Sequence, residues 1–330
     1  MKDDVRRGGI DEALLRDIAA EAATAFNNGA RQVQPFSARY PDLRMDDAYR
    51  IAALANGMRV AKGYRPVGRK IGFTNRRIWD EYGVHAPVWG YVYDRTVYDL
   101  PIGSSSFRGA SEGSEPGIQK NTRSLLLDSG SGPEPAIGPA IGRTRWGRPG
   151  MTEEGLPLAP YSDPKIEPEI MFGLARAPSP GLDDAALLAC ISWVAHGYEI
   201  VQSIYPDWKF TPPDAVIVDG HHAALLIGAR HEIGTNTAEW LRTLASFEIE
   251  LFCEGKLMDK GHALNVLEGP LSTIRYLMDL LARDPDNPPL AAGEIISTGT
   301  LTRALPVKPG ETWTTKLKGI ALEDISLRFE

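Results

Sequence analysis

The sequence has little cysteine, no long apolar run and no excess of positive charge. Its only two cysteines, Cys190 and Cys253, lie in the apolar stretches LLACIS and ELFCEG, which argues against a disulfide framework and a thiolate metal site. The net charge of -7 argues against a nonspecific nucleic-acid binder, because affinity for polyanions depends on many Lys and Arg side chains. No apolar run approaches the roughly 20 residues that span a bilayer, and MKDDVRRGGIDEALL is not typical of a cleaved leader. We therefore expect a cytoplasmic protein that binds neither nucleic acid nor membrane.

The common nucleotide-binding and nucleophile motifs are also missing. Neither a GxGxxG string nor a P-loop occurs, and no serine or cysteine lies in a GxSxG or comparable setting. The 330 residues are 43% hydrophobic and 24% charged, which is ordinary globular composition. Since single cores stop growing at roughly 250 to 300 residues, this length favours one main domain with an appendage or an insertion.

The hydrophobic pattern predicts strands with a few segregated helices. Apolar residues at spacings of three and four predict helices over 11–25, 45–62, 182–195 and 271–283. Alternating or short apolar runs predict strands at VGRKIGFTN and over 166–174, 199–204, 223–227, 247–253, 256–258, 294–298, 312–317 and 325–329. This arrangement favours the α+β class over a doubly wound sheet.

Composition and hydrophobic pattern divide the chain into a cap, a main domain and an insertion. The first two helices predict an N-terminal helical cap over 1–65, followed by a catalytic domain over 66–330. The segment 104–160 is rich in Gly, Ser, Pro and Arg and lacks long apolar periodicity, so we interpret it as an irregular insertion in that domain. The domain is expected to resume at Tyr161.

Two glutamates in the string KIEPEIMF are the first candidates for chemistry. Glu167 and Glu169 are two positions apart in a predicted strand, so both carboxylates point to one face while Ile166 and Ile170 point to the other. Such a pair either is a solvated strand face or chelates a cation.

A third carboxylate would favour the cation. Glu199 lies in HGYEIVQS, where an acid among apolar neighbours is costly unless it is paired, metal-bound or at an edge facing water. Three carboxylates without Cys or His ligands are typical of a site for Mg²⁺ or Mn²⁺.

Other polar residues are weaker candidates. Lys70 lies between glycines in GRKIG and is either a surface side chain or a buried acid, base or anion anchor. Thr298 and Thr300, in STGT, could contact a carboxylate, although a plain glycine turn explains the string equally well. The tandem His221 and His222 would face opposite ways in a strand, so we expect a structural pair or one active-site histidine, His221.

Five strings, taken in order, resemble a known family. VGRKIGFTN, PKIEPEIMFGLAR, GYEIVQSIYPDWKF, LNVLEGPLSTIRYLMDLL and GEIISTGTLTRALPVKPGE are similar to the 2-keto-4-pentenoate hydratase and 4-oxalocrotonate decarboxylase group of the fumarylacetoacetate hydrolase superfamily. The similarity covers 45–96 and 160 to the C-terminus. It implies the superfamily's mixed β-sheet roll, a role in aromatic catabolism and a homo-oligomer, with a complex with a related decarboxylase or hydratase as a further option.

The resemblance also implies site residues and a substrate class. Glu167, Glu169 and Glu199 would hold the divalent cation, and Lys70 would serve catalysis or substrate binding. Lys209 of the DWKF string joins Thr298 and Thr300 as candidate substrate contacts. The substrate would be a small 2-oxo acid such as 2-hydroxypenta-2,4-dienoate, hydrated through a metal-stabilised dienolate.

One departure from the family leaves the reaction open. Relatives commonly have an acid-base Asp shortly after the KIG string, where this chain has Val88 in HAPVWG, so His85 becomes a candidate replacement. Hydration is our first expectation. A 4-oxalocrotonate-type decarboxylase, an acylpyruvate hydrolase and a noncatalytic partner subunit of an active relative are the alternatives.

Overall fold

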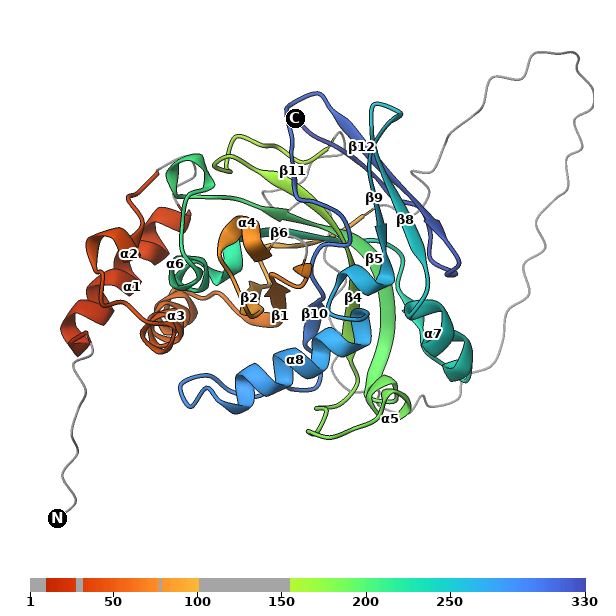
Figure 1. Cartoon of the computed structure of the whole chain (residues 1–330), viewed down its shortest axis with the longest axis horizontal. Coiled ribbons are helices and arrows are strands. Elements are labelled where there is room, and N and C mark those ends of the chain that lie inside the picture. Colours follow the sequence, from red (N-terminus) through yellow and green to blue (C-terminus); the bar gives the residue numbers. More distant parts are fainter. Residues whose placement is uncertain (1–9, 28–31, 77–78, 101–154) are drawn as a thin grey trace, which may run out of the picture.

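The computed structural model describes residues 10–27, 32–76, 79–100 and 155–330, and it is built around one curved mixed sheet (Figure 1). The strand order is β2-β1-β10-β4-β5-β6-β3, with β11 paired to β4 and β7 paired to β5. The pairs β1 with β10 and β3 with β6 are parallel, and the others are antiparallel. The strands are β1 (Pro66–Gly72), β2 (Val88–Tyr93), β3 (Val97–Asp99), β4 (Lys165–Leu174), β5 (Ile191–Val201), β6 (His222–Ile227), β7 (His231–Glu232), β10 (Ile295–Ser297) and β11 (Leu305–Pro306).

A second, antiparallel sheet packs beside the first. Its strands run in the order β13-β12-β8-β9, and they are β8 (Glu248–Cys253), β9 (Lys256–His262), β12 (Thr312–Lys318) and β13 (Ser326–Arg328). Trp313 of β12 and Leu251 of β8 share a buried cluster with Tyr198 and Ile200 of β5. The α+β class and the curled mixed sheet predicted from the sequence are therefore confirmed.

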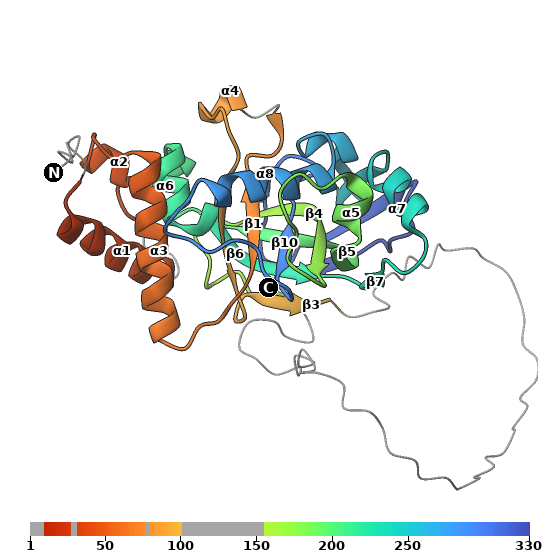
Figure 2. The ribbon, with the colours of Figure 1, turned by 90° about the horizontal axis from the view of Figure 1, so that it is seen from below.

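Helices form a cap at one end of the sheet. The N-terminal helices α1 (Glu12–Asn27), α2 (Phe36–Arg39) and α3 (Met45–Ala61) meet α6 (Pro212–Ile217) from the second half of the chain, as Figures 1 and 2 show. Apolar residues of all four share one cluster, and the carboxylate of Asp214 in α6 accepts hydrogen bonds from Ser37 N and Oγ. The predicted helices over 11–25 and 45–62 are present, and the cap includes α6.

The remaining helices lie outside this cap. They are α4 (Trp79–Tyr82), α5 (Asp184–Leu188), α7 (Thr237–Leu244) and α8 (Pro270–Ala282). Of the short 3₁₀ turns, η2 (Pro206–Trp208) and η3 (Asp219–His221) flank α6, and η4 (Ala263–Asn265) precedes α8. The apolar stripe of α8, with Ile274 and Leu277, packs in one cluster with Ile170 and Phe172 of β4. The prediction of a helix over 271–283 is therefore confirmed, and this packing fixes one face of β4.

The prediction of one helix over 182–195 was wrong. Only Asp184–Leu188 is helical, and β5 begins at Ile191. The run ISWVAHGYEIV is buried along nearly its whole length, so its continuous apolar pattern resembles a buried helix as much as a central strand. As a result, Glu199 lies inside a strand and not at a helix end.

The packed fold resumes earlier than we expected. Leu156 is fully buried and bridges Phe329, and Leu158 is also buried in the same cluster. Residues 155–160, which we assigned to the insertion, therefore belong to the packed domain. Most of the expected insertion, 104–154, lies outside the described residues.

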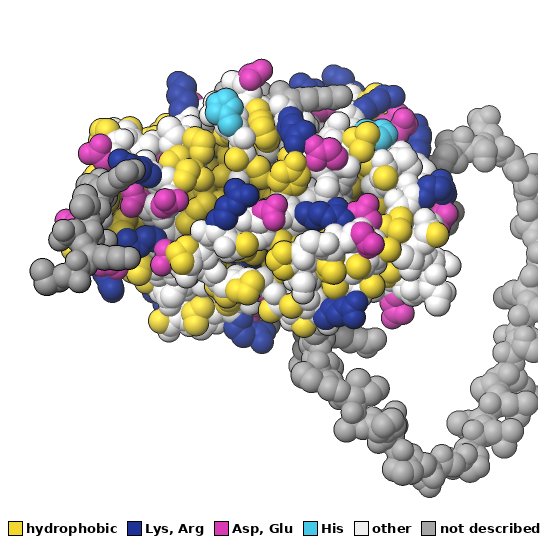
Figure 3. Space-filling view, turned by 60° about the horizontal axis from the view of Figure 1, so that its bottom comes forward, with side chains coloured by type: hydrophobic (Ala, Val, Ile, Leu, Met, Phe, Trp, Pro, Cys, Tyr) yellow, Lys and Arg dark blue, Asp and Glu magenta, His cyan; other side chains and the backbone are white. Residues whose placement is uncertain are grey.

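Two observations concern the surface of the described part of the chain. Within the described ranges, no helix is long and apolar enough to cross a membrane. Figure 3 shows Lys and Arg side chains interspersed with Asp and Glu on the face that it presents, so the described part of that face has no continuous basic stripe. Such a mixed face is not typical of a nucleic-acid-binding surface.

Candidate metal centre and active site

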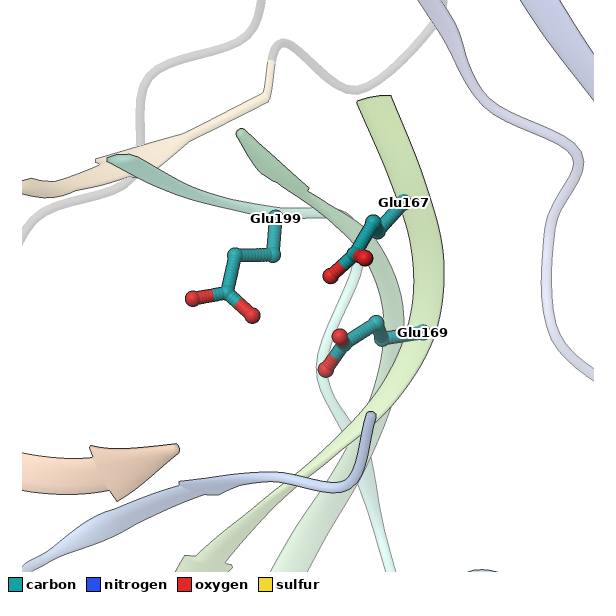
Figure 4. Close-up of side chains that lie close together, drawn as sticks. All are labelled: Glu167, Glu169 and Glu199. Atoms are coloured by element: carbon teal, nitrogen blue, oxygen red, sulfur yellow. The ribbon is translucent and has the colours of Figure 1, made fainter. Parts of the chain in front are cut away.

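Three glutamates converge at the centre of the main sheet. Glu167 and Glu199 lie directly opposite each other across the antiparallel pair β4 and β5, and Glu169 lies two positions further along β4. Because side chains alternate along a strand, all three project from the same face of the sheet. Figure 4 shows them pointing into one space, and one oxygen of each lies within 4.8 Å of the others.

Burial makes this grouping electrostatically costly. Glu169 and Glu199 are 0% exposed, and Glu167 is half-buried. Desolvation, with the nearby carboxylates, raises the pKa of Glu169 well above its usual range and that of Glu167 to about 7. The pKa of Glu199 is lowered instead, because the charge of Lys70 and the hydrogen bond from His222 outweigh its burial.

Neighbouring groups hold two of the carboxylates in fixed orientations. Ser297 Oγ and the backbone N–H of Gly299, at 2.9 Å, both donate to Glu169 Oε2. His222 Nδ1 donates to Glu199 Oε1 at 2.8 Å, and its Nε2 lies 2.8 Å from Thr96 Oγ1. These contacts involve Oε2 of Glu169 and Oε1 of Glu199.

The second oxygen of Glu169 indicates what the site can bind. Among the described residues, Glu169 Oε1 is buried and has no hydrogen-bond partner. A buried, unpaired carboxylate oxygen is expensive, and a cation between the three carboxylates would satisfy it. An all-oxygen donor set of this kind fits a hard divalent cation such as Mg²⁺, Mn²⁺ or Ca²⁺. The predicted cation type is therefore consistent with the cluster.

Lys70 is the cation already present in this cluster. It lies in β1, is 3% exposed, and its Nζ is 3.1 Å from Glu199 Oε2 and 2.9 Å from the carbonyl oxygen of Gly220. Burial lowers its pKa, but the three carboxylates raise it by more, so the net shift is upward. Lys70 is thus a buried ammonium, and the surface alternative for it was wrong.

A pocket of about 280 Å³ opens onto this centre. Such a volume suits a small substrate, near the lower end of ordinary ligand sites. Glu167, Lys70 and His221 line its inner part together with backbone of Gly220 and Gly299. The other lining residues are Gly72, Phe73, Thr74, Asn75, Val88, Lys165, Val201, Trp208, Phe210, Thr300, Thr302, Arg303, Ala304 and Leu305.

The turn that carries His221 has an uncommon backbone. Asp219, Gly220 and His221 have φ values of 52°, 62° and 66°, all in the left-handed region. A left-handed conformation costs roughly 1–2 kcal/mol for a residue with a side chain, so the surroundings must hold this turn in place. The contact from Lys70 to the Gly220 carbonyl and a buried ion pair from Arg59 to Asp219 do so.

The structure does not bring all the predicted site residues together. Thr300 lines the pocket, but its hydroxyl donates to the Thr302 carbonyl. Thr298 is fully buried beside the site, and its hydroxyl donates to the Ile170 carbonyl.

Two predicted residues lie outside the pocket. His85 is exposed, on the loop before β2, and it is not among the lining residues, whereas Val88 is. Lys209 is also outside the lining, and its side chain is 82% exposed beside Asp207. The local reason is the backbone of η2, which has a left-handed conformation at Asp207, with a φ of 55°. As a result, Trp208 lines the pocket and Lys209 does not.

Sequence reasoning missed several residues of the site. Lys165 lies two positions before Glu167 on the same strand face, so the alternation that paired the glutamates could have found it. Its Nζ lies 4.0 Å from the centre of the Trp208 ring. His222 and Ser297, which orient the glutamates, left no pattern in the sequence that points to that role.

Comparisons with known proteins agree with these observations. No family model matches the chain. A 2-hydroxyhexa-2,4-dienoate hydratase of Comamonas testosteroni is 25% identical over 88% of this chain and 89% of its own length. A 4-oxalocrotonate decarboxylase of Pseudomonas sp. strain CF600 is 26% identical over 97% and 100%, and a 2-keto-4-pentenoate hydratase of Paraburkholderia xenovorans strain LB400 is 24% identical over 92% of each.

Solved structures extend the comparison to the fold. The 4-oxalocrotonate decarboxylase of Pseudomonas putida G7, complexed with magnesium and adipate, covers 98% of this chain and 99% of its own with a TM-score of 0.74 and 21% identity. A fumarylacetoacetate hydrolase family protein from yeast has a TM-score of 0.51, with 16% identity, over 82% of this chain and 94% of its own. The resemblance predicted from the five strings is confirmed: the chain is a sequence relative of 2-keto-4-pentenoate hydratases and 4-oxalocrotonate decarboxylases, and its fold is that of the fumarylacetoacetate hydrolase superfamily.

Proposed function

We propose that this protein is a divalent-metal-dependent hydratase of 2-oxo acids like 2-hydroxypenta-2,4-dienoate. The observation that supports it most is the convergence of Glu167, Glu169, Glu199 and Lys70 beside one small pocket, which Glu167 and Lys70 line. Three carboxylates retain a cation, and the buried ammonium adds a second positive charge. Such a centre suits a substrate that carries a 1-carboxylate and develops negative charge on its 2-oxygen.

The three glutamates are the proposed ligands of the cation. When bound, a divalent cation supplies Lewis-acid polarisation of the 2-oxo group, which favours the enolate form of the substrate. Ser297 and the Gly299 amide hold Glu169 in place for this role, and His222 holds Glu199. These contacts orient Glu169 and Glu199 and leave Glu169 Oε1 without a hydrogen-bond partner among the described residues.

Lys70 is the proposed electrostatic partner of the substrate. Its ammonium is buried, so its field is screened less than that of a surface lysine. It would stabilise the negative charge that appears on the substrate when the enolate forms, while the Gly220 carbonyl and Glu199 keep it in position.

One observation favours decarboxylation as a second candidate. Lys165 and Arg303 line the same pocket, and 4-oxalocrotonate has a second carboxylate that a cation at this position could bind. Arg303 is also held by Asp259, whose Oδ2 lies 2.9 Å from its Nε. Both reactions share the enolate, so the substrate and not the centre would distinguish them.

Turnover measurements with two substrates test the proposal. Purified protein loaded with Mg²⁺ or Mn²⁺ should hydrate 2-hydroxypenta-2,4-dienoate with a higher kcat/KM than it decarboxylates 4-oxalocrotonate, and EDTA should abolish both rates. The reverse order of kcat/KM would replace the hydratase with the decarboxylase. Stoichiometric metal binding without turnover of either substrate, or of acylpyruvates, would instead favour a noncatalytic subunit.

A further inference from the structure

His221 lines the pocket and has one ring nitrogen without a hydrogen-bond partner among the described residues. It is 4% exposed, lines the pocket, and its Nδ1 lies 3.1 Å from the backbone carbonyl oxygen of Gln202. Within the described residues, the other ring nitrogen, Nε2, is buried and has no hydrogen-bond partner. A buried nitrogen without a partner, in a residue that borders a substrate-sized space, indicates that a ligand or water completes its hydrogen bonding.

The contact with Gln202 fixes which nitrogen carries the proton. A carbonyl oxygen only accepts hydrogen bonds, so Nδ1 must be the N–H donor. Burial and the positive charge of Lys70 lower the pKa of His221 to about 3, so the ring is neutral at neutral pH. In a neutral ring with Nδ1 protonated, Nε2 holds a lone pair and acts only as an acceptor.

The surroundings hold this ring in place. Its centroid lies 4.2 Å from that of Phe210 and 5.3 Å from that of Trp208, and Tyr205 meets it edge-on at 6.0 Å. The left-handed turn that carries it stores backbone strain, and such strain clusters at functional sites. A rigid ring with one unused acceptor is pre-organised for a polar ligand.

The charged residues of the pocket lining are unsuited to the role of proton acceptor. Lys70, Lys165 and Arg303 are cationic donors, and Glu167 belongs to the carboxylate cluster. Val88, which also lines the pocket, has no polar atom. Among the lining residues with an ionisable side chain, His221 is therefore the neutral one with a lone pair outside the cluster.

We propose that His221 Nε2 is the general base that activates the water added to C4 of the substrate. The inference rests on the proposed hydratase function. The addition starts from the 2-oxo-3-enoate tautomer of the substrate, in which the proton of the 2-hydroxyl group has moved to C5. As the water oxygen bonds to C4, its O–H bond breaks and the proton moves to Nε2, while the C3=C4 electron pair shifts to C2=C3 and the C2=O pair moves onto the oxygen to form the enolate. The imidazolium then returns the proton to C3, which gives the 4-hydroxy-2-oxo acid and restores the neutral ring. Lys70 faces the enolate charge in the same step.

Two variants distinguish a role of His221 as a base from a purely structural role. His221→Gln keeps polar bulk but has no basic nitrogen, whereas His221→Gly leaves room for free imidazole and suits the φ of 66°. We expect kcat for hydration to fall by about 10² to 10⁴ in both, the usual scale of a positioned base. Mn²⁺ affinity should stay within threefold of wild type, and imidazole should restore the rate of His221→Gly in proportion to its basic form. His231→Gln, on β7 and bound to Glu323, is the matched control with wild-type rates.

Nitrogen NMR of histidine-labelled protein supplies a readout that does not need turnover. Spectra are recorded at pH 7 from the metal-free protein and from protein loaded with Mg²⁺, which is diamagnetic. In both samples the His221 signals should be those of the neutral tautomer with the proton on Nδ1. A proton on Nε2, or a hydration rate in His221→Gln within threefold of wild type, would overturn the inference and leave the hydratase proposal standing. Absence of hydration in the wild type would overturn both.

Discussion

Arg59 and Asp219 form an ion pair in which both side chains are only 3% exposed. The pair joins α3 of the cap to the left-handed turn that carries His221, and Asp219 Oδ1 also accepts from the backbone N–H of Tyr91 at 3.2 Å. The cap is therefore tied to the site through buried charge as well as through apolar packing.

Removing one partner of this pair should be costly. Arg59→Leu leaves the Asp219 carboxylate buried without its counter-ion, and such changes typically cost about 3–5 kcal/mol. We expect a loss of this size in the free energy of urea unfolding. The double variant Arg59→Leu, Asp219→Leu should recover part of it, and equal destabilisation in the single and double variants would show that the pair is not the cause.

Glu169→Gln should lose the metal while keeping the fold. The neutral amide is a poorer ligand for a hard cation, and removing one of three buried like charges should raise the thermal midpoint of the metal-free protein. Metal content after gel filtration and thermal midpoints with and without Mg²⁺ measure both effects. A variant that retains metal at wild-type stoichiometry would contradict the assignment of this ligand.

Lys70→Met should lower the rate of catalysis in a protein that still folds. The change keeps the length of a buried side chain and removes its charge, so we expect kcat to fall by about 10² or more. Lys256→Met, on the exposed hairpin between β8 and β9, is the matched control. Wild-type turnover in Lys70→Met would remove Lys70 from the mechanism.

The contribution of Glu167 and Glu169 to the stability of the metal-free protein should fall between pH 5 and pH 8. Burial raises the pKa of Glu167 from an ordinary value of 4.5 to about 7, and raises that of Glu169 well above 4.5. Between these pH values the folded state therefore holds protons that the unfolded state has released. The contribution of these two glutamates to the free energy of unfolding is fully present below pH 4.5 and is lost as the pH rises through 7. The pKa of Glu199 is lowered, so its contribution to stability changes only below pH 4.5, outside this window.

Thermal midpoints in EDTA measure this effect. Wild type should lose more stability from pH 5.5 to pH 8 than the Glu167→Gln, Glu169→Gln double variant. The stabilisation by Mg²⁺ should grow over the same range, because binding requires the deprotonated carboxylates. Parallel pH profiles for the two proteins would contradict the raised pKa values.

The boundary of the insertion can be tested by two deletions. Replacing 106–152 with a short Gly/Ser linker should leave the thermal midpoint nearly unchanged, since loop closure depends weakly on length. Extending the deletion to 160 removes the buried Leu156 and Leu158, and each lost core leucine should cost about 2–5 kcal/mol. Aggregation of the shorter deletion would show that 106–152 contributes to the fold or to an interface.

Residues close together in the sequence were the predictable part of the site. The alternation of a strand places Glu167 and Glu169 on one face whatever the tertiary structure, and the same rule extends to Lys165. The amphipathic stripe of α8 was equally plain, because helical spacing is a local property. The proposed ligand pair and most of the helices therefore followed from local geometry.

Residues brought together by long-range pairing were not predictable from pattern alone. Glu199 was a candidate because of its apolar setting, but its place opposite Glu167 depends on the pairing of β5 with β4, which no local pattern predicts. The first half of β5 was also mistaken for a helix, because its apolar run has no clear period. Lys209 was a wrong choice because the turn at Asp207, which no local pattern predicts, leaves its side chain outside the pocket.

The pairing of β1 with β10 has a consequence for how the protein is made. Arg69 on β1 and Glu294, directly before β10, are 225 positions apart, so β1 leaves the ribosome long before its parallel partner exists. Contacts of such high sequence separation form late and slow folding, and an unpaired strand is open to aggregation while it waits. Because Lys70 lies on β1 and Ser297 on β10, the chemistry assembles only when nearly the whole chain has been synthesised, and truncated chains should be inactive and dependent on chaperones.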